Sequence, residues 1–455
     1  MRISNRLSAV LPVHIDLKER SKLMKKNLSV LTILVLVVAL FSNVVRAQDK
    51  THLLWGMWGD PVEIVDHQKV ADAYMAANPD VEIELWAQPW SDYFTKLDTL
   101  FAAGDASVIP DVFWQSSVQK YASSGLIQNL DPLIEKSGMD LKDYWPGVLA
   151  TTSWNGSVYG FPRDIAAEVL YYDKDDFDAA GLDYPTEDWT WDDLRAAAEK
   201  LTIKDDTGRT SRYGLAAEGG KYFDFVGANG GAILDDVFKP TECKLSTPES
   251  IEGFEYFSGL MNDGFAWRDA DLGQAGGDQA VFLADQASMF IQNASRVPAL
   301  NEAKINYDVA PIPKAPSGGR QGGLSNGAAW VISALTDQTD AAWDFVQFLQ
   351  SPEGGAAIYS ASGGAFPPTK ASAEAPAFMD DSRGPANKQA FLIDAESVNP
   401  NGYGWFADYN EMNSTLISPA LATIWSGEAK PADVLPGLCD DVNKFLADHG
   451  YTATS

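Results

Sequence analysis

The stretch Pro110–Leu130, PDVFWQSSVQKYASSGLIQNL, decides the fold of this chain. It begins with a short apolar run, Asp111–Trp114, which predicts a buried strand, and continues through a polar loop, Gln115–Ser117. A helix is expected from Val118, and Gly125 is suited to the left-handed conformation that ends a helix. Because open α/β sheets place ligand groups at the carboxyl ends of their strands, this strand delivers Trp, Gln and Ser to such a position.

The segments before this stretch alternate between strand and helix patterns. The expected strands and helices are His52–Met57, Val62–Ala77, Val81–Trp86 and Ser91–Ala103, in that order. This order is typical of a mostly parallel, doubly wound sheet. After the stretch, Asn155-Gly156 predicts a two-residue hairpin turn, and a crossing between two lobes is expected near Phe161–Ala166.

The second half repeats the alternation. Its expected strands are Glu168–Asp173, Ala287–Ile291, Tyr307–Ala310 and Ala328–Ile332. Its expected helices are Trp191–Leu201, Tyr222–Asn229, Pro248–Met261, Asp278–Asp285, Asp337–Leu349, Tyr409–Ser426 and Pro431–Asp448. The region Gly363–Gly404 is expected to consist mostly of loops.

The amino-terminal residues 1–47 are typical of an export signal. A basic start at Met24-Lys25-Lys26 precedes the apolar run Leu28–Phe41, and Val45-Arg46-Ala47 offers a cleavage site. The run is short against the roughly 20 residues that span a membrane, although an uncleaved anchor is the alternative. Met24 is also the better start of translation. No Cys lies at the expected cleavage site after the run, so we expect a protein of the Gram-negative periplasm without a lipid anchor.

Composition excludes several classes of protein. The segment 1–47 carries eight of the 34 Lys and Arg and two of the 63 Asp and Glu, so the remaining 408 residues have a net charge of −35. Such an acidic surface repels nucleic acids and anionic lipids, so neither is expected as a partner. A chain of this length exceeds a single core, and two lobes are expected.

Cysteine and histidine usage bears on disulfides and metals. Cys243 and Cys439 are the only cysteines, and in an exported chain they either form one disulfide or remain buried thiols. The histidines after the export segment, His52, His67 and His449, lack metal-ligand spacing. Neither a metal site nor a cofactor is expected.

Several sequence landmarks then follow one another in a characteristic order. They are YGFP with YYDKDDF (Tyr159–Phe177), WTWDDL (Trp189–Leu194), AVFLADQASMFIQN (Ala280–Asn293), GGLSNGAAWVIS (Gly322–Ser333) and AAWDFVQFLQSPEGG (Ala341–Gly355). Together with the PD-apolar-apolar-W strand, they make the chain resemble the family 1 extracellular solute-binding proteins, the maltose-binding-protein relatives that serve ABC importers. The resemblance covers about Leu53–Phe445.

The resemblance implies a two-lobed α/β fold of the type II periplasmic-binding-protein kind, with mostly parallel sheets and a ligand cleft between the lobes. It also implies closure of the lobes on binding. The expected division is 48–162 and 312–365 for the amino-terminal lobe, and 163–311 and 366–455 for the carboxyl-terminal lobe. The Pro-, Gly- and Ser-rich segment Pro311–Gly327 is interpreted as the return through the hinge, although its composition also suits an ordinary loop.

Candidate ligand residues follow from the chemistry of sugars. A pyranose packs its flat C–H faces on aromatic rings, and its hydroxyls suit carboxylates, amides and guanidinium groups. Aromatic and polar residues that match cleft positions of the family are Trp58, Asp60, Glu63, Trp114, Gln115, Ser116, Arg163, Asp164, Tyr222, Asn293, Tyr403 and Trp405. Gly323 is added because a glycine allows close approach of the backbone to a ligand, although plain turn geometry also explains it.

Several of these residues also have structural interpretations. Asp60 and Glu63 suit the capping of a helix start, and Arg163 with Asp164 suits a surface ion pair. The family often carries an Asp near Ser116 and a Trp or Pro near Asn293. Both are missing from this chain, which removes one customary aromatic plate.

The function expected from the sequence is capture of a carbohydrate or polyol and delivery to a membrane permease by a monomer that catalyses no reaction. The alternatives are a secreted glycoside hydrolase, and the same fold binding a polyamine or peptide. A hydrolase needs two carboxylates that flank one bond, and no local motif nominates such a pair. The chain also lacks a nucleophile elbow, a phosphate-binding loop and an H-E-x-x-H motif.

Overall fold

The computed structural model describes residues 50–59, 61–145, 147–320, 328–361, 363–380, 382, 384–398, 400–401 and 403–452, without the side chains of 61–63. The export signal expected at 1–47 therefore lies outside the described residues, as do Asp60 and Gly323. The description below concerns the unit that begins at Thr51.

A five-stranded sheet forms the centre of the first lobe, with the strand order β2-β1-β3-β12-β6. The strands are β1 (Thr51–Trp58), β2 (Val81–Gln88), β3 (Val112–Gln115), β6 (Gly160–Pro162) and β12 (Ala329–Ile332). Strands β2, β1 and β3 are parallel, as the alternation of strands and helices predicts.

Strand β12 runs antiparallel to both of its neighbours, β3 and β6. The chain leaves this sheet at Pro162 and returns to it at Ala329, and the two residues are paired across the strands. Ala329 is also paired with Gln115, at the carboxyl end of β3. Strand β12 therefore begins at the edge of the sheet where β3 ends. Because it starts there, it must run in the direction opposite to β3.

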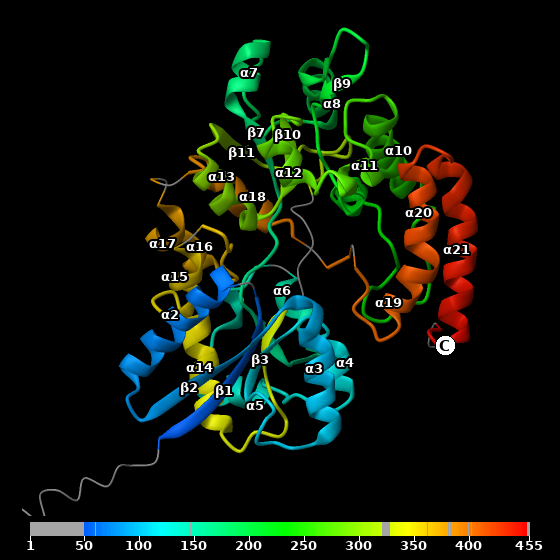
Figure 1. Ribbon diagram of the computed structural model, residues 1–455. Helices are drawn as coiled ribbons and strands as arrows, with labels where there is room; N and C mark the ends of the chain where they lie inside the picture. Colours follow the sequence, from blue (N-terminus) through cyan, green and yellow to red (C-terminus); the bar gives the residue numbers. More distant parts are fainter. Residues whose placement is uncertain are drawn as a thin grey trace, which may run out of the picture. The chain divides into compact units, whose positions relative to one another are not determined.

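Helices cover both faces of this sheet (Figure 1). On one face, α2 (Pro61–Ala77), α14 (Thr339–Gln350) and α15 (Gly355–Ser360) pack over Trp55 and Trp330. On the other face, α3 (Trp90–Ala103) and α4 (Val118–Ser123) pack over Phe113 and Val331. Neighbouring strand residues point to opposite faces, so all four residues of β3 are buried, which explains its unbroken apolar pattern.

The second lobe is built on a three-stranded sheet with the order β10-β7-β11. Its strands are β7 (Val169–Asp173), β10 (Met289–Gln292) and β11 (Tyr307–Ala310), and all of its pairings are antiparallel. Strand β7 comes directly from the first lobe, whereas β10 and β11 run toward it. The expectation of parallel pairing is therefore wrong for this sheet, because its central strand enters from the edge where the other two end.

Helices α7, α8, α10, α11, α12, α13 and α18 surround this sheet (Figure 1). Their bounds are Lys174–Ala180, Trp191–Leu201, Pro248–Asn262, Asp269–Gln274, Asp278–Leu283, Val297–Ala303 and Gln389–Ala395. Helix α8 begins with a capping box, in which Thr190 and Asp193 bind each other's backbone N–H groups.

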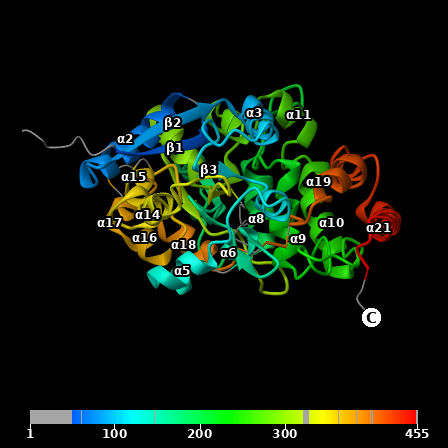
Figure 2. The ribbon, with the colours of Figure 1, turned by 90° about the horizontal axis from the view of Figure 1, so that it is seen from below.

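The chain ends in a pair of helices that pack against α10 (Figure 1, Figure 2). They are α20 (Ser418–Trp425) and α21 (Pro431–Asp448), and α19 (Tyr409–Met412) precedes them through a π-helical turn at Asn413–Ile417. Cys439 of α21 forms a disulfide bond with Cys243, so of the two possibilities for the cysteines the structure shows the disulfide.

Short elements complete the fold. They are α5 (Asp131–Ser137), α6 (Val148–Thr151), β4 (Ser153–Trp154), β5 (Ser157–Val158), β8 (Ile203–Lys204), β9 (Thr210–Arg212), α9 (Tyr222–Ala228), α16 (Lys370–Glu374) and α17 (Pro376–Met379). The hairpin between β4 and β5 turns at Asn155 and Gly156, both with positive φ, as the sequence predicts. Gly125 also has the left-handed conformation expected after α4.

The expectation of mostly loops between Gly363 and Gly404 is wrong in part, because α16, α17 and α18 lie there. Each has only one or two turns, which is too short for an apolar periodicity to be visible in the sequence. Their starts are set locally instead, by the Thr369 side chain that accepts from Ser372 N in α16 and by Pro376 at the first turn of α17.

Candidate ligand-binding site

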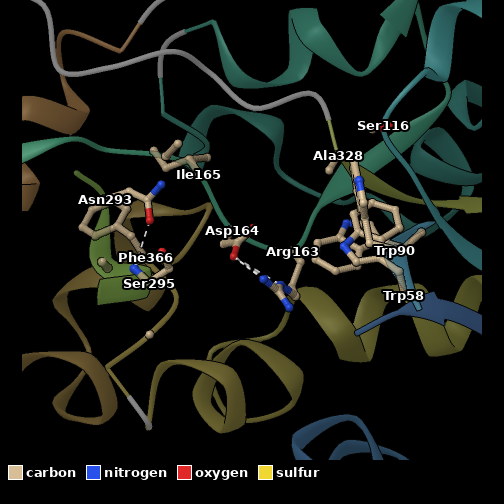
Figure 3. Close-up of a pocket in the computed structure, with 14 residues that line it drawn as sticks. Trp58, Trp90, Ser116, Arg163, Asp164, Ile165, Asn293, Ser295, Ala328 and Phe366 are labelled. Carbon is tan, nitrogen blue, oxygen red and sulfur yellow. Dashed lines mark hydrogen bonds and ion pairs between the residues drawn. The ribbon is translucent and has the colours of Figure 1, made fainter. Parts of the chain in front are cut away.

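A pocket of about 280 Å³ is lined by residues of both lobes. Its walls are formed where β1, β3 and β10 end, where β12 begins, and by the crossing that follows β6. The lining residues are Trp58, Trp90, Trp114, Ser116, Arg163, Asp164, Ile165, Ala166, Asn293, Ala294, Ser295, Ala328, Gly364 and Phe366 (Figure 3). The pocket therefore lies where α/β sheets commonly bind ligands.

Three tryptophans from three neighbouring parallel strands form the wall of the first lobe. Trp58 is the last residue of β1, Trp90 follows β2 after one proline, and Trp114 lies near the end of β3. The rings of Trp58 and Trp114 are stacked, with centroids 3.9 Å apart and planes inclined by 8°. Trp90 meets Trp58 edge to face, at 5.0 Å and 84°.

Arg163 lies against the face of Trp114 that Trp58 does not cover. Its guanidinium carbon is 4.1 Å from the Trp114 ring centroid and 5.5 Å from that of Tyr359. Arg163 also donates from Nε and Nη2 to Oδ2 of Asp164, at 3.2 and 2.7 Å. The two side chains are only 13% and 16% exposed, so this is a mostly buried pair held between aromatic rings and not the surface pair considered from the sequence.

A buried aromatic cluster packs against Trp114 and fixes the Trp58–Trp114 stack. His67, 1% exposed, touches the rings of Trp55, Trp114, Trp330 and Tyr359. The backbone carbonyl of Trp114 accepts a hydrogen bond of 2.7 Å from the Tyr93 hydroxyl. Because close-packed rings have few alternative rotamers, this wall is pre-organised.

The second lobe contributes a polar wall after β10. Asn293 Oδ1 accepts a hydrogen bond of 3.0 Å from the backbone N of Ser295, and the Asn293 carbonyl accepts one of 2.8 Å from Tyr171. Ser295 is exposed and Asn293 is half-buried. Phe366 lies near these residues in Figure 3 and adds an apolar ring to the same wall.

The second lobe also contains a buried group of charged side chains. Lys221 forms an ion pair with Glu168, the residue that precedes β7. Burial opposes the charged form of Lys221, but attraction to Glu168 and Asp224 outweighs it, so the pKa of Lys221 is raised. Burial, reinforced by Glu168, raises the pKa of Asp224 well above its usual range. Burial also raises the pKa of Asp278, which lies at the start of α12.

The structure brings together Trp58, Trp114, Ser116, Arg163, Asp164 and Asn293 of the residues proposed from the sequence. Tyr403 and Trp405 lie instead in a separate hollow of about 50 Å³, which Ser116 also borders. Trp405 is largely buried there and donates from Nε1 to the carbonyl of Pro400 at 2.9 Å.

Two further proposed residues, Gln115 and Tyr222, also lie outside the lining of the main pocket. Gln115 is fully buried, and its Oε1 accepts a hydrogen bond of 2.8 Å from Ser117 N. Tyr222 is stacked on Phe254 in the core of the second lobe, with centroids 4.8 Å apart. Asp60 and Gly323 are outside the described residues, and Glu63 is placed only by its backbone in α2.

The sequence reasoning missed eight of the lining residues, namely Trp90, Ile165, Ala166, Ala294, Ser295, Ala328, Gly364 and Phe366. For Trp90 a signal exists, because it lies shortly after the predicted strand Val81–Trp86 and directly before the predicted helix Ser91–Ala103. For Phe366 the local pattern offers none, because its neighbours form an irregular segment distant in sequence from the rest of the site.

Within the described ranges, no three His, Cys, Asp or Glu side chains are grouped so that they could hold a metal ion. Across the same residues, no helix is both long and apolar enough to cross a membrane.

Two α/β lobes that share a pocket at their strand ends define a solute receptor of the periplasmic-binding-protein class. The chain belongs to the bacterial extracellular solute-binding protein family, whose model matches residues 69–386. This confirms the resemblance noted in the sequence.

Similar proteins include a putative binding protein of Brucella abortus, 26% identical over 384 residues, which are 81% of this chain and 86% of the relative. A maltotriose-binding protein of Pyrococcus abyssi is 28% identical over 304 residues, which are 64% of this chain and 61% of that protein. Among solved structures, an ABC substrate-binding protein of Listeria monocytogenes in complex with cycloalternan superimposes with a TM-score of 0.71. It is 24% identical, and the match covers 88% of this chain and all of that structure. This likeness confirms the two-lobed fold.

Proposed function

We propose that this protein is the substrate-binding component of an ABC importer and that its ligand is a carbohydrate or polyol. The observation that carries the proposal is the pocket between the lobes, in which an aromatic wall of three tryptophans faces the polar wall of Asn293 and Ser295. Rings that pack on sugar C–H faces and polar groups that meet hydroxyls are what a saccharide site requires. The maltotriose-binding relative and the cycloalternan complex support the same ligand class.

The charges of the pocket favour an uncharged ligand. Of the described lining residues, only Arg163 and Asp164 carry charge, and they form a close pair. The positive charges of a polyamine would be repelled by the Arg163 guanidinium. Asp164 would attract them only weakly, because it is already paired with Arg163. This argues for a sugar over the polyamine or peptide alternative.

The same observation argues against hydrolysis as the function. A glycoside hydrolase needs two carboxyl groups about 5–5.5 or 6.5–9.5 Å apart across the bond that is cleaved. Asp164 is the single carboxylate among the described lining residues, and it is bonded to Arg163, so these residues offer no second carboxyl group to flank a bond. Pure binding with release to a permease therefore fits the pocket better.

Transport follows from closure of the two lobes around the ligand. Moving the lobes from mostly open to mostly closed needs a preference of about 5.5 kcal/mol for the closed form. New hydrogen bonds to the polar wall and one stacked ring are of the right size to supply it. We further propose that residues 1–47 direct export to the periplasm and are removed. The mature protein then acts as a monomer. Its first lobe consists of residues 48–162 and 312–365, and its second lobe consists of residues 163–311 and 366–455.

The test is a thermal-shift screen of the purified protein against monosaccharides, disaccharides, oligosaccharides and polyols, followed by calorimetry on each compound that binds. A ligand that binds only the folded state raises the melting temperature by mass action. We expect a shift for at least one neutral saccharide or polyol, and recovery of that compound unchanged after incubation. A shift only with polyamines or peptides, or turnover of an oligosaccharide, would overturn the proposal.

A further inference from the structure

The three tryptophans of the pocket do not present equivalent surfaces to a ligand. Trp114 is only 4% exposed. The Trp58 ring lies 3.9 Å from it, and the Arg163 guanidinium carbon lies 4.1 Å from its centroid. Two groups at such distances cannot share one side of a ring, so they cover opposite faces of Trp114. A sugar ring therefore has no face of Trp114 on which to stack.

Trp58 is also committed to its neighbours. One of its faces carries Trp114, and Trp90 and Tyr93 pack against it in edge-to-face arrangements with ring centroids at 5.0 and 5.3 Å. Phe94 lies 5.4 Å away at a tilt of 44°. Trp58 is thus the centre of a ring cluster and leaves little apolar face for a ligand.

Trp90 differs from both of these residues. It is 58% exposed, the highest value among the large apolar side chains of the described residues. Its orientation is nevertheless fixed, because its ring meets Trp58 at 84° and Phe94 at 86°, each about 5 Å away. A large apolar side chain that is both ordered and exposed on a pocket wall is typical of a ligand-stacking position.

We propose that Trp90 is the residue on which a ring of the ligand stacks, and that Trp114 is a positioning residue that holds Arg163. This inference rests on the proposed function and deepens it, because it names the aromatic contact that selects the ligand. A ligand on Trp90 presents one flat apolar face to the indole, and its polar edge extends toward Arg163 and Ser116. The favoured ligands are saccharides with a pyranose ring whose equatorial substituents leave such a face, and linear polyols bind less well.

Fluorescence provides a direct test of the contact. Iodide should quench Trp90 strongly in the free protein because its ring is exposed, and a saturating sugar from the screen should reduce that quenching. The variant Trp90→Phe should lose this ligand-dependent protection. If the sugar protects the variant as much as the wild type, Trp90 is not the contact.

Calorimetry provides the quantitative test with the same sugar. Trp90→Ala should weaken binding about 10- to 30-fold, since it removes the apolar face that the ring covers. Trp90→Phe, which keeps a flat ring, should remain within about threefold of the wild type. The control Trp154→Ala removes a half-buried tryptophan outside the pocket and should leave affinity unchanged.

The outcomes separate the inference from the proposed function. If the wild type binds no saccharide or polyol, the proposed function fails and the inference fails with it. If the wild type binds and Trp90→Ala binds equally well, the inference alone is overturned. If Trp90→Ala does not fold, the comparison of Trp90→Phe with the wild type in quenching still decides the question.

Discussion

The substitution Arg163→Lys tests whether the flat guanidinium on Trp114 organises the pocket. Lysine keeps the positive charge and can reach Asp164, but its ammonium cannot lie flat on an indole ring or donate in a fork. The variant therefore separates the contribution of planar stacking from that of charge.

The magnitude follows from burial and distance. A cation over a tryptophan contributes about 0.5–1 kcal/mol when exposed and about 2 kcal/mol or more when desolvated. The Arg163 side chain is 13% exposed and its guanidinium carbon lies 4.1 Å from the ring, so the desolvated end of this range applies. Lysine retains part of the interaction with Asp164, which leaves an expected loss of about 1–2 kcal/mol. Because the ligand must restore this arrangement when it binds to the variant, the same free energy is lost from binding, which corresponds to about 5- to 30-fold weaker affinity.

Calorimetry with the sugar found in the screen measures this effect, and near-ultraviolet circular dichroism checks that the Trp58–Trp114 stack persists. The matched control is Arg195→Lys, because Arg195 pairs with Asp263 outside the pocket and both side chains are more than a third exposed. The control should bind like the wild type. Binding by Arg163→Lys within about twofold of the wild type would refute the idea that the stacked guanidinium matters.

Three further predictions concern stability. Replacing Cys243 and Cys439 together by alanine should lower the melting temperature by about 3–10 °C, since the bond links residues 196 positions apart; an unchanged melting curve would contradict this. Thr190→Ala should cost about 0.5–2 kcal/mol in urea unfolding through loss of the α8 cap, an effect that Thr190→Ser should largely restore. The folded state holds the proton of Asp224 more tightly than the unfolded state, because burial raises its pKa. The stability from this group is therefore complete below about pH 3.8 and is lost as pH rises toward the folded pKa; Asp224→Asn should flatten that decline in melting temperatures measured from about pH 4 to 8.

The elements that carry their own local signal could be predicted from the sequence. The strand at Val112–Gln115 is apolar on both faces because helices cover both, and Trp191–Leu201 is bounded by its capping box. Asn155 and Gly156 adopt the positive φ values that their hairpin needs. In each case the residues that determine the structure are neighbours in the chain.

The strand directions and parts of the site could not be predicted in this way. The antiparallel entry of β12 depends on where the chain returns after a long excursion, which no local pattern records. Gln115 and Trp114 are adjacent in one strand, and only the assembled packing shows that the first is buried beside Ser117 while the second borders the pocket. Whether a tryptophan can stack on a ligand or only positions other side chains depends on its neighbours across the sheet, as the difference between Trp90 and Trp114 illustrates.

The pairing of Pro162 with Ala329 has a consequence for engineering. These residues end one strand and begin the next in an antiparallel pair, so a two-residue turn would join them as an ordinary hairpin. The residues between them are therefore a topological insertion in the first sheet. Excising it together with residues 366–455, which we assign to the second lobe, would leave a single-lobed scaffold that still carries the three indoles. From this half-receptor a two-part binder could be rebuilt by fusing a different partner.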